Sequence, residues 1–371
     1  MRHMKFQAFL LALSLLLTLG ACKPSAEEPS GAPSGTASEP AVPSAEPTVE
    51  PTQEPSAEPS GGITGVEPGP GMRIAVLSGP TGVGAAKLLD NIDNNPAALH
   101  GSGYSYAIAN DNSELVASLT KGEVDIATVA SNMAVNLYGK TDGGVQIIAV
   151  GTLGVLHILE GGGKTEINSL ADLAGKTVYA AGQGANPEYV LRYLLQENGL
   201  EIGKDVEVVF ADASEISAKL LSGEIECAML PVPAATAAII KGEGSVRQAI
   251  DLTEAWDSLK NGSQLIMTAV VARTEFVQTY PDLVDAFLAD YEASIDFVNN
   301  NQDAAAEMIA RLGITPSAAI AKQAIPQCHL AFLSGSDMVA AISDYYSVLW
   351  SVDPASVGGS LPDDGIYWWT E

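Results

Sequence analysis

The 371-residue sequence is poor in cysteine, histidine and positive charge. It contains three cysteines and four histidines, and its 18 Lys and Arg residues stand against 45 Asp and Glu residues, a formal net charge of −27. No paired CxxC, HExxH or GxSxG motif occurs, so the sequence offers no zinc-binding or nucleophile pattern of those kinds. The shortage of basic residues excludes the positively charged surface that nucleic acid requires.

The N-terminal residues predict an export signal. Arg2 and Lys5 provide a basic start, and the apolar run that follows from Phe6 to Leu19 is too short to cross a membrane. This order of basic, apolar and small residues predicts a secretory signal peptide over residues 1–21. Cys22, directly after Gly-Ala, resembles the lipobox of bacterial lipoproteins. The resemblance implies a lipid anchor on Cys22 that holds the exported protein at the cell membrane, and an ordinary signal peptide is the alternative.

Residues 22–71 comprise this cysteine and a predicted disordered stalk. The stretch after Cys22 holds 11 of the chain's 21 prolines and repeats Ser-Ala-Glu-Pro at positions 44 and 56. Its few apolar side chains cannot offset the entropy of ordering, which predicts disorder. As a flexible coil the stretch spans roughly 40 Å, and over about 100 Å when extended. Such a tether suits a domain that docks on a partner at the membrane.

Residues 72–371 are numerous enough for two compact lobes. This part of the chain keeps 37 acidic and 15 basic residues, about −22 in charge, which favours solubility and repels anionic lipid. Its two cysteines, Cys227 and Cys328, both lie in apolar surroundings. They either pair in a disulfide or remain buried free thiols, and the sequence leaves both alternatives open.

The folded part contains an internal repeat. Ser113–Val129 aligns without gaps to Ser214–Leu230 at a shift of 101 residues, with seven of 17 positions identical. Apolar residues at helical spacing precede Gly122 and Gly223, which are predicted to end the two helices in a left-handed conformation. The apolar run after each glycine predicts a buried strand.

The strand and glycine loop before each repeat also correspond. Arg73–Gly79 aligns with Lys176–Gly182, and in the second copy Asn186 is predicted to cap a helix with Pro187 in its first turn. Strands that alternate with helices predict an α/β fold of two lobes, each a mostly parallel sheet flanked by helices. The rest is predicted to be helical, except for a strand at Gln264–Val271.

The expected lobes are residues 72–153 with 265–371, and residues 154–264. In open α/β sheets, ligands bind beyond the carboxyl ends of strands, near helix N-termini, which selects two matched loops from each lobe. Gly151 and Gly154, in the segment between the repeats, predict a hinge. The candidate ligand-binding residues are Gly79, Pro80, Thr81, Gly82, Ser131, Asn132, Thr152, Gln183, Gly184, Ala185, Asn186, Pro231 and Pro233.

Five segments of the folded part carry a family resemblance: GPTGVGAAKLL, LTKGEVDIATV, SLADLAGKTVYAAGQGANPEYVLRYLL, PDLVDAFLADYEASIDFVNNN and VGGSLPDDGIYWW. Through them, residues 72–369 resemble the solute-binding lipoproteins of ABC importers, in the group that binds nitrate, sulfonate or taurine, and thiamine-pyrimidine precursors. The resemblance implies a two-lobed periplasmic-binding-protein fold of type II. It also implies a monomer without cofactor or metal that captures a small organic solute between the lobes. The closed form then delivers this solute to a membrane permease and its ATPase.

Other functions are less well supported by the residues. The stretch Leu77–Leu89 looks like a phosphate-binding loop, but Ala85 and Ala86 stand where that loop needs Lys and Ser or Thr. Related folds host lyases and a pyrimidine synthase, and a small-molecule enzyme is therefore an alternative, although no catalytic residue is predicted. A tethered surface scaffold is a further alternative.

The chemical class of the solute stays open at this point. Glycine loops at helix N-termini offer N–H donors that suit a carboxylate, sulfonate or phosphate. Glu188 in the first turn of the second helix opposes this, and Arg192 is the only nearby cation. A neutral or aromatic solute packed by Tyr138, Tyr179 or Tyr189 is the alternative.

Overall fold

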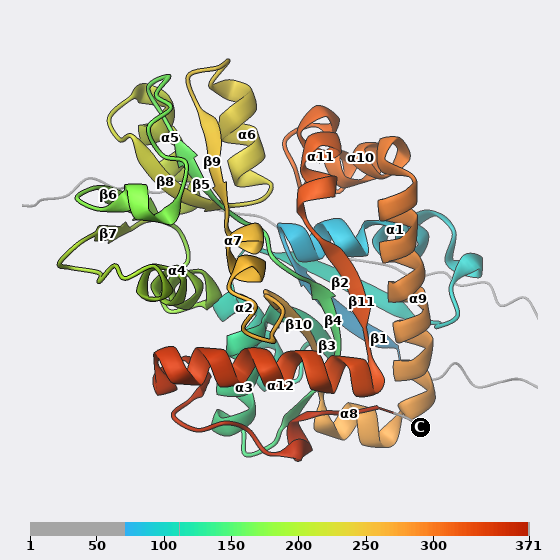
Figure 1. Cartoon of the computed structure of the whole chain (residues 1–371). Coiled ribbons are helices and arrows are strands. Elements are labelled where there is room, and N and C mark those ends of the chain that lie inside the picture. The colour runs from blue at the N-terminus through green and yellow to red at the C-terminus, as the bar shows by residue number, and fades with distance from the viewer. Residues whose placement is uncertain (1–70, 111, 370–371) are drawn as a thin grey trace, which may run out of the picture. The chain divides into compact units, whose positions relative to one another are not determined.

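The computed structural model describes residues 71–110 and 112–369 (Figure 1). All of them belong to one unit of the chain, Thr64–Glu371. The predicted signal peptide, Cys22 and the predicted stalk up to residue 70 lie outside the described residues. No helix within the described part is long and apolar enough to cross a bilayer.

The first sheet has six strands in the order β11-β4-β10-β3-β1-β2. β1 pairs in parallel with β2 and β3, whereas β10 runs antiparallel to β3 and β4. All five residues of β3 are buried, as expected of a strand covered on both faces. The strands are β1 (Met72–Leu77), β2 (Tyr104–Ala109), β3 (Ile126–Ala130), β4 (Val145–Thr152), β10 (Thr268–Arg273) and β11 (Leu330–Leu333).

The second sheet has five strands in the order β7-β6-β8-β5-β9. β6 pairs in parallel with β7 and β8, and β5 runs antiparallel to β8 and β9. The chain passes from the first sheet to the second over the three residues between β4 and β5. The strands are β5 (Leu156–Glu160), β6 (Thr177–Ala180), β7 (Glu207–Phe210), β8 (Cys227–Pro231) and β9 (Arg247–Asp251).

The predicted internal repeat corresponds to a duplicated topology. The strand order β2-β1-β3 of the first sheet recurs as β7-β6-β8 in the second. Gly122 and Gly223, which follow α2 and α5, have φ values of 70° and 77°, the left-handed conformation expected at these helix ends. The predicted α/β class with two helix-flanked sheets is therefore confirmed, although both sheets are mixed. The repeat helices are α1 (Pro80–Asn94), α2 (Asn112–Thr120), α4 (Asn186–Glu197) and α5 (Ala213–Ser222).

The C-terminal helices cover the first sheet. Helix α9 packs beside α1 (Figure 1), and Ser294 on α9 donates a hydrogen bond to the Gly84 carbonyl at 2.7 Å. Apolar residues at helical spacing on α9, from Val284 to Val298, are buried against this region. The remaining helices are α3 (Ser131–Lys140), α6 (Ala234–Lys241), α7 (Leu252–Ser258), α8 (Thr274–Thr279), α9 (Pro281–Asn300), α10 (Gln302–Arg311), α11 (Ala318–Ala324) and α12 (Gly335–Val352).

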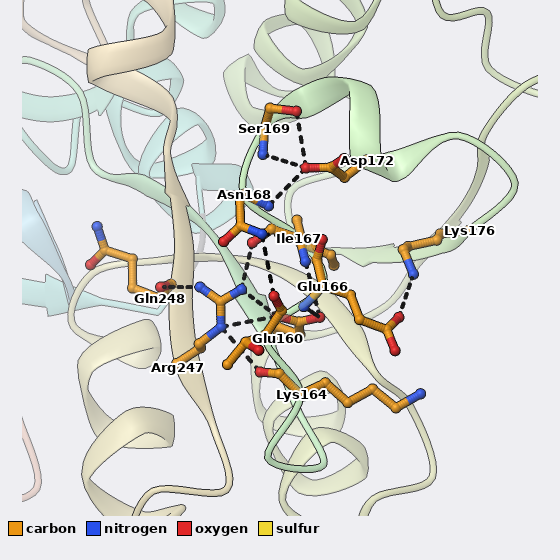
Figure 2. A network of polar contacts seen from close by, with 11 residues as sticks. Glu160, Lys164, Glu166, Ile167, Asn168, Ser169, Asp172, Lys176, Arg247 and Gln248 are labelled. Atoms are coloured by element: carbon orange, nitrogen blue, oxygen red, sulfur yellow. Dashed lines mark hydrogen bonds and ion pairs between the residues drawn. The ribbon is translucent and has the colours of Figure 1, made fainter.

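An ion pair between a buried carboxylate and a partly buried arginine organises the edge of the second sheet. Glu160 on β5 accepts hydrogen bonds from the backbone N–H groups of Glu166 and Ile167, at 2.9 and 3.2 Å, and from Arg247 Nε on β9 at 2.9 Å (Figure 2). Arg247 also donates to the Lys164 carbonyl at 3.1 Å. The pair thus joins two strands and the loop that follows β5.

Removing the cation should expose the role of this pair. Arg247→Met leaves the Glu160 carboxylate buried without a counter-charge, so we expect the free energy of unfolding to fall by about 3–5 kcal/mol. Chemical denaturation followed by circular dichroism measures the change. Lys204→Met is the matched control, because Lys204 and its partner Glu201 are each 69% exposed and their pair should contribute little. Equal losses in the two variants would contradict the assigned role.

A second buried carboxylate joins three strands of the first sheet. Asp125, just before β3, accepts hydrogen bonds from Arg73 Nε and Nη2 at 2.9 and 2.6 Å and from Arg273 Nη2 at 2.8 Å. Burial by itself would raise the pKa of Asp125, but the bonds from the two arginines outweigh it and hold the pKa below its ordinary value.

The lowered pKa of Asp125 predicts a dependence of stability on acid. The folded state releases this proton more readily than the unfolded chain, whose Asp pKa is near 3.9. The contribution of Asp125 is therefore complete above that value and is lost as the pH falls through the folded-state pKa. We expect Asp125→Asn to flatten the fall in unfolding free energy below about pH 5, measured by denaturation at several pH values. The exposed variant Asp257→Asn should keep the wild-type slope, and an unchanged slope in Asp125→Asn would refute the assignment.

Candidate functional site

Three of the predicted site residues meet in one buried cluster, here called the polar seam and defined as Ser131, Asn132 and Asn186 with the backbone of Ile266 and Met267. The Asn186 side-chain N–H₂ donates to Ser131 Oγ at 2.8 Å and to the Met267 carbonyl at 2.7 Å. The Asn186 backbone N–H donates to Asn132 Oδ1 at 3.2 Å, and Ser131 Oγ donates to the Ile266 carbonyl at 2.7 Å. Helix α3 follows β3 of the first sheet, and α4 follows β6 of the second sheet. The seam therefore joins the first turns of two helices that belong to different sheets.

Asn186 does not cap α4, so that prediction is wrong. Ala185 occupies the N-cap position without a side-chain bond, and Asn186 is the first helical residue, with Pro187 next to it as expected. The Asn186 side chain is instead fully buried among its partners across the seam. Glu188 makes a side-chain bond near this helix start instead, because its Oε2 accepts the Gly184 N–H at 2.8 Å.

Thr152 lies beside the seam at the end of β4. Its carbonyl accepts the Met267 N–H at 3.2 Å. Thr152 Oγ1 and Asn186 Oδ1 are both buried and have no hydrogen-bond partner among the described residues. Buried polar atoms are nearly always paired in native proteins, so these two oxygens mark places where a further donor is expected.

The glycines of the predicted hinge are needed for close packing. Neither Gly151 nor Gly154 has a positive φ. A Cβ atom at Gly151 would lie 2.2 Å from the Tyr291 hydroxyl oxygen, and one at Gly154 would lie 2.0 Å from Thr253 Oγ1. The connection between the sheets is therefore glycine-rich because neighbouring side chains leave no room there, rather than for backbone freedom.

The first glycine loop lies apart from the seam in its bonding. Thr81 Oγ1 donates to the Leu77 carbonyl at 3.0 Å and accepts the Leu77 N–H at 3.1 Å. Its hydroxyl therefore bonds to the last residue of β1, directly before this loop, and not to the seam. Gly79 is the N-cap of α1, with Pro80 in the first turn. A Cβ atom at Gly82 would lie 2.8 Å from the Leu77 carbonyl oxygen, which explains the glycine there by close packing.

The loop that contains Pro231 and Pro233 packs on the first sheet's core. Val232 between them is fully buried in the same apolar cluster as Ile74 of β1 and Leu330 of β11. The Val232 N–H donates to the Val155 carbonyl at 2.9 Å, in the connection between the sheets. Both prolines are half-buried and flank this contact.

A pocket of about 830 Å³, here called the cleft pocket, opens next to the seam. It borders three predicted residues, Gln183, Gly184 and Ala185, and also Tyr179, one of the tyrosines considered for an aromatic solute. The sequence reasoning missed the lining residues that follow β2 and β7. The same carboxyl-end rule would have found them, had it been applied to those two strands. The other lining residues are Asn112, Ser113, Met133, Gly182, Val209, Phe210, Ala211, Asp212, Glu215 and Lys219.

The charges around the cleft pocket are mostly paired within the protein. Lys219 Nζ lies 2.9 Å from Glu215 Oε1, and this hydrogen bond raises the pKa of Lys219. Lys219 Nζ also lies 5.9 Å from the centroid of the Tyr179 ring. On the adjoining helix, Arg192 Nη2 lies 3.0 Å from Glu188 Oε1. Asp212, the N-cap of α5, makes no side-chain capping bond.

Comparison with known proteins gives a family and a fold. The profile of the family described as NMT1/THI5 like matches residues 106–305. No curated protein matches the chain. Among solved structures, an ABC transporter from Parabacteroides distasonis is 24% identical, with a TM-score of 0.67 over 81% of this chain and 99% of that one.

Two further solved structures share the fold at lower identity. The periplasmic aliphatic sulphonate binding protein SsuA from Escherichia coli is 16% identical, with a TM-score of 0.61 over 76% of this chain and 87% of that one. The ligand binding component of an ABC-type import system from Staphylococcus aureus, with zinc bound, is also 16% identical, with a TM-score of 0.61 over 80% and 96%. These likenesses establish that the chain has the fold of periplasmic binding proteins.

Disrupting the polar seam should separate the two sheets. Asn186→Ala removes the side-chain bonds to Ser131 and Met267, so we expect a more open protein with a larger radius of gyration by small-angle X-ray scattering. The unfolding free energy should fall by about 1–3 kcal/mol, since buried partners are left unpaired. Asn198→Ala at the other end of α4 is the control, because Asn198 is exposed and its side chain donates to the nearby Leu194 carbonyl. A radius of gyration unchanged in Asn186→Ala would contradict the role of the seam.

Proposed function

This chain belongs to the NMT1/THI5-like family, and on that basis we propose that it is the extracytoplasmic substrate-binding component of an ABC importer. It captures a small organic solute between two lobes, residues 72–153 with 265–371 and residues 154–264. The closed, loaded form then binds a membrane permease that works with a cytoplasmic ATPase. The fold shared with ABC-transporter binding proteins supports this assignment.

The polar seam beside the cleft pocket is the observation that carries the proposal. Loops from both sheets meet there, with Thr152, Ser131, Asn132 and Asn186 fully buried. Two of their oxygens lack a partner among the residues that the structure describes. A solute that contacts both lobes favours the arrangement in which the polar seam is formed, here called the joined state, only under one condition. It must bind the joined state more tightly than a state in which the lobes are apart. Contacts with residues that line the cleft pocket from both sheets, such as Met133 and Gln183, would supply that difference.

The cysteines support binding rather than nucleophilic catalysis. Both Cys227 and Cys328 are buried free thiols, and they do not form the disulfide that the sequence left open. Burial raises the pKa of each thiol to about 12, so neither is a thiolate near neutral pH. His329, next to Cys328 in sequence, directs Nδ1 to the Gly154 carbonyl at 2.6 Å.

The N-terminal segment supports a location outside the cytoplasm. In this proposal the predicted signal peptide of residues 1–21 is removed on export and Cys22 carries a lipid at the outer surface of the cell membrane. The predicted stalk of residues 22–71 would then give the binding domain enough reach to meet the permease in the same membrane.

Native mass spectrometry of the freshly purified full-length protein tests the proposal. We expect a fraction of the protein to carry one small organic molecule, whose mass is lost when the protein is unfolded. Readdition of that molecule should raise the melting temperature, because a ligand that binds only the folded state stabilises it. Gln183→Ala, at the edge of the cleft pocket, should weaken its binding by roughly 5- to 10-fold. A protein that carries no solute and is stabilised by none would be a scaffold, and the proposal would be wrong.

A further inference from the structure

The start of α4, which the sequence suggested as an anion site, already holds a carboxylate of the protein. Glu188 Oε2 accepts the Gly184 N–H at 2.8 Å, while Glu188 Oε1 holds Arg192 Nη2 at 3.0 Å. The backbone N–H groups of Ala185 and Asn186 donate to the Gly182 carbonyl and to Asn132 Oδ1, at 3.2 Å each. A sulfonate, carboxylate or phosphate would therefore have to displace Glu188 to bind at this helix start.

The side chains that line the cleft pocket leave a negative balance. Lys219 is the single basic residue among its described lining residues, and its charge is offset by Glu215 at 2.9 Å. Asp212 is exposed at the pocket, and its carboxylate makes no capping bond to α5. An anion would meet Asp212 without an unpaired cation nearby, whereas a cation would be attracted by it. The charge of about −22 on residues 72–371 strengthens that attraction.

Aromatic and apolar side chains form much of the remaining lining. Tyr179, Phe210, Val209 and Met133 all border the pocket. The Lys219 ammonium lies 5.9 Å from the centroid of the Tyr179 ring, a distance at which an aromatic face attracts a cation. Val209 is 41% exposed, high for a large apolar residue, and an apolar body in the pocket would cover it.

We infer that the captured solute is an organic cation, an amine-bearing molecule with an apolar or aromatic body, and not an anion. The inference rests on the proposed function, because it names the class of solute for the same cleft. Asp212 attracts the cationic group, and Tyr179 and Val209 pack against the body.

Thermal-shift screening of the full-length protein tests the class of solute. The probes are equal numbers of small amines and quaternary ammonium compounds, uncharged amides and alcohols, and sulfonates, carboxylates and phosphates. We expect binders in the cationic class, with affinities then measured by calorimetry. Asp212→Asn should weaken these binders by about 10-fold or more. Asp257→Asn is the matched control, because Asp257 is exposed and lies outside the pocket lining, and it should bind as wild type does.

The outcomes separate this inference from the proposed function. Binders confined to the anionic or uncharged classes overturn the cationic class and leave solute capture intact. Cationic binders whose affinity is the same in Asp212→Asn overturn the site of recognition assigned here. No binder in any class, for a protein whose circular dichroism shows it folded, overturns the proposed function and this inference with it.

Discussion

The reach of the Asn186 side chain from α4 to the Met267 carbonyl is the constraint on which the rest of the site depends. This bond, 2.7 Å long, joins a helix of the second sheet to the segment that returns to the first sheet. Ser131 is held against the same segment, with its backbone N–H 3.1 Å from the Met267 carbonyl oxygen. The seam thus connects the start of α3, after β3, with the glycine loop before α4 and with the segment that leads into β10. Because its members are fully buried, separating the sheets exposes several polar groups at once, which makes the joined state sensitive to what binds beside it.

Much of the architecture could be predicted from local patterns. The 101-residue shift predicted two copies of one topology, and the glycines that end α2 and α5 have the expected backbone conformation. What local patterns could not supply were partners distant in sequence. Asn186 has the residue type and position of a helix cap, yet its side chain bonds across the seam. The predicted strand at Gln264–Val271 begins only at Thr268, because the carbonyls of Ile266 and Met267 are turned to Ser131 and Asn186 instead of a neighbouring strand.

The location of the candidate site could be predicted from the sequence, but the charge of its ligand could not. The rule that ligands bind at the carboxyl ends of strands brought Ser131, Asn132 and Asn186 together, and it extends to the residues after β2 and β7 that line the cleft pocket. The rule does not give the sign of the ligand's charge. A helix start with glycines normally favours an anion, but Glu188 has taken that position from within the protein. The exposed carboxylate of Asp212 at the cleft pocket is the basis of the cationic class inferred above, whereas SsuA, which shares the fold, is a sulphonate binding protein.

The central claim is that a solute stabilises the joined state of the two lobes. Single-molecule fluorescence energy transfer tests it most directly, with dyes on cysteines introduced at Lys204 and Asp337, which are exposed and lie in the two proposed lobes. The native Cys227 and Cys328 are buried, and replacing Cys22 by Ser leaves the two introduced cysteines for labelling. The account predicts that adding the co-purified solute moves the population from low to high transfer efficiency, with a midpoint at its dissociation constant. A transfer distribution that stays unchanged at saturating solute would contradict it.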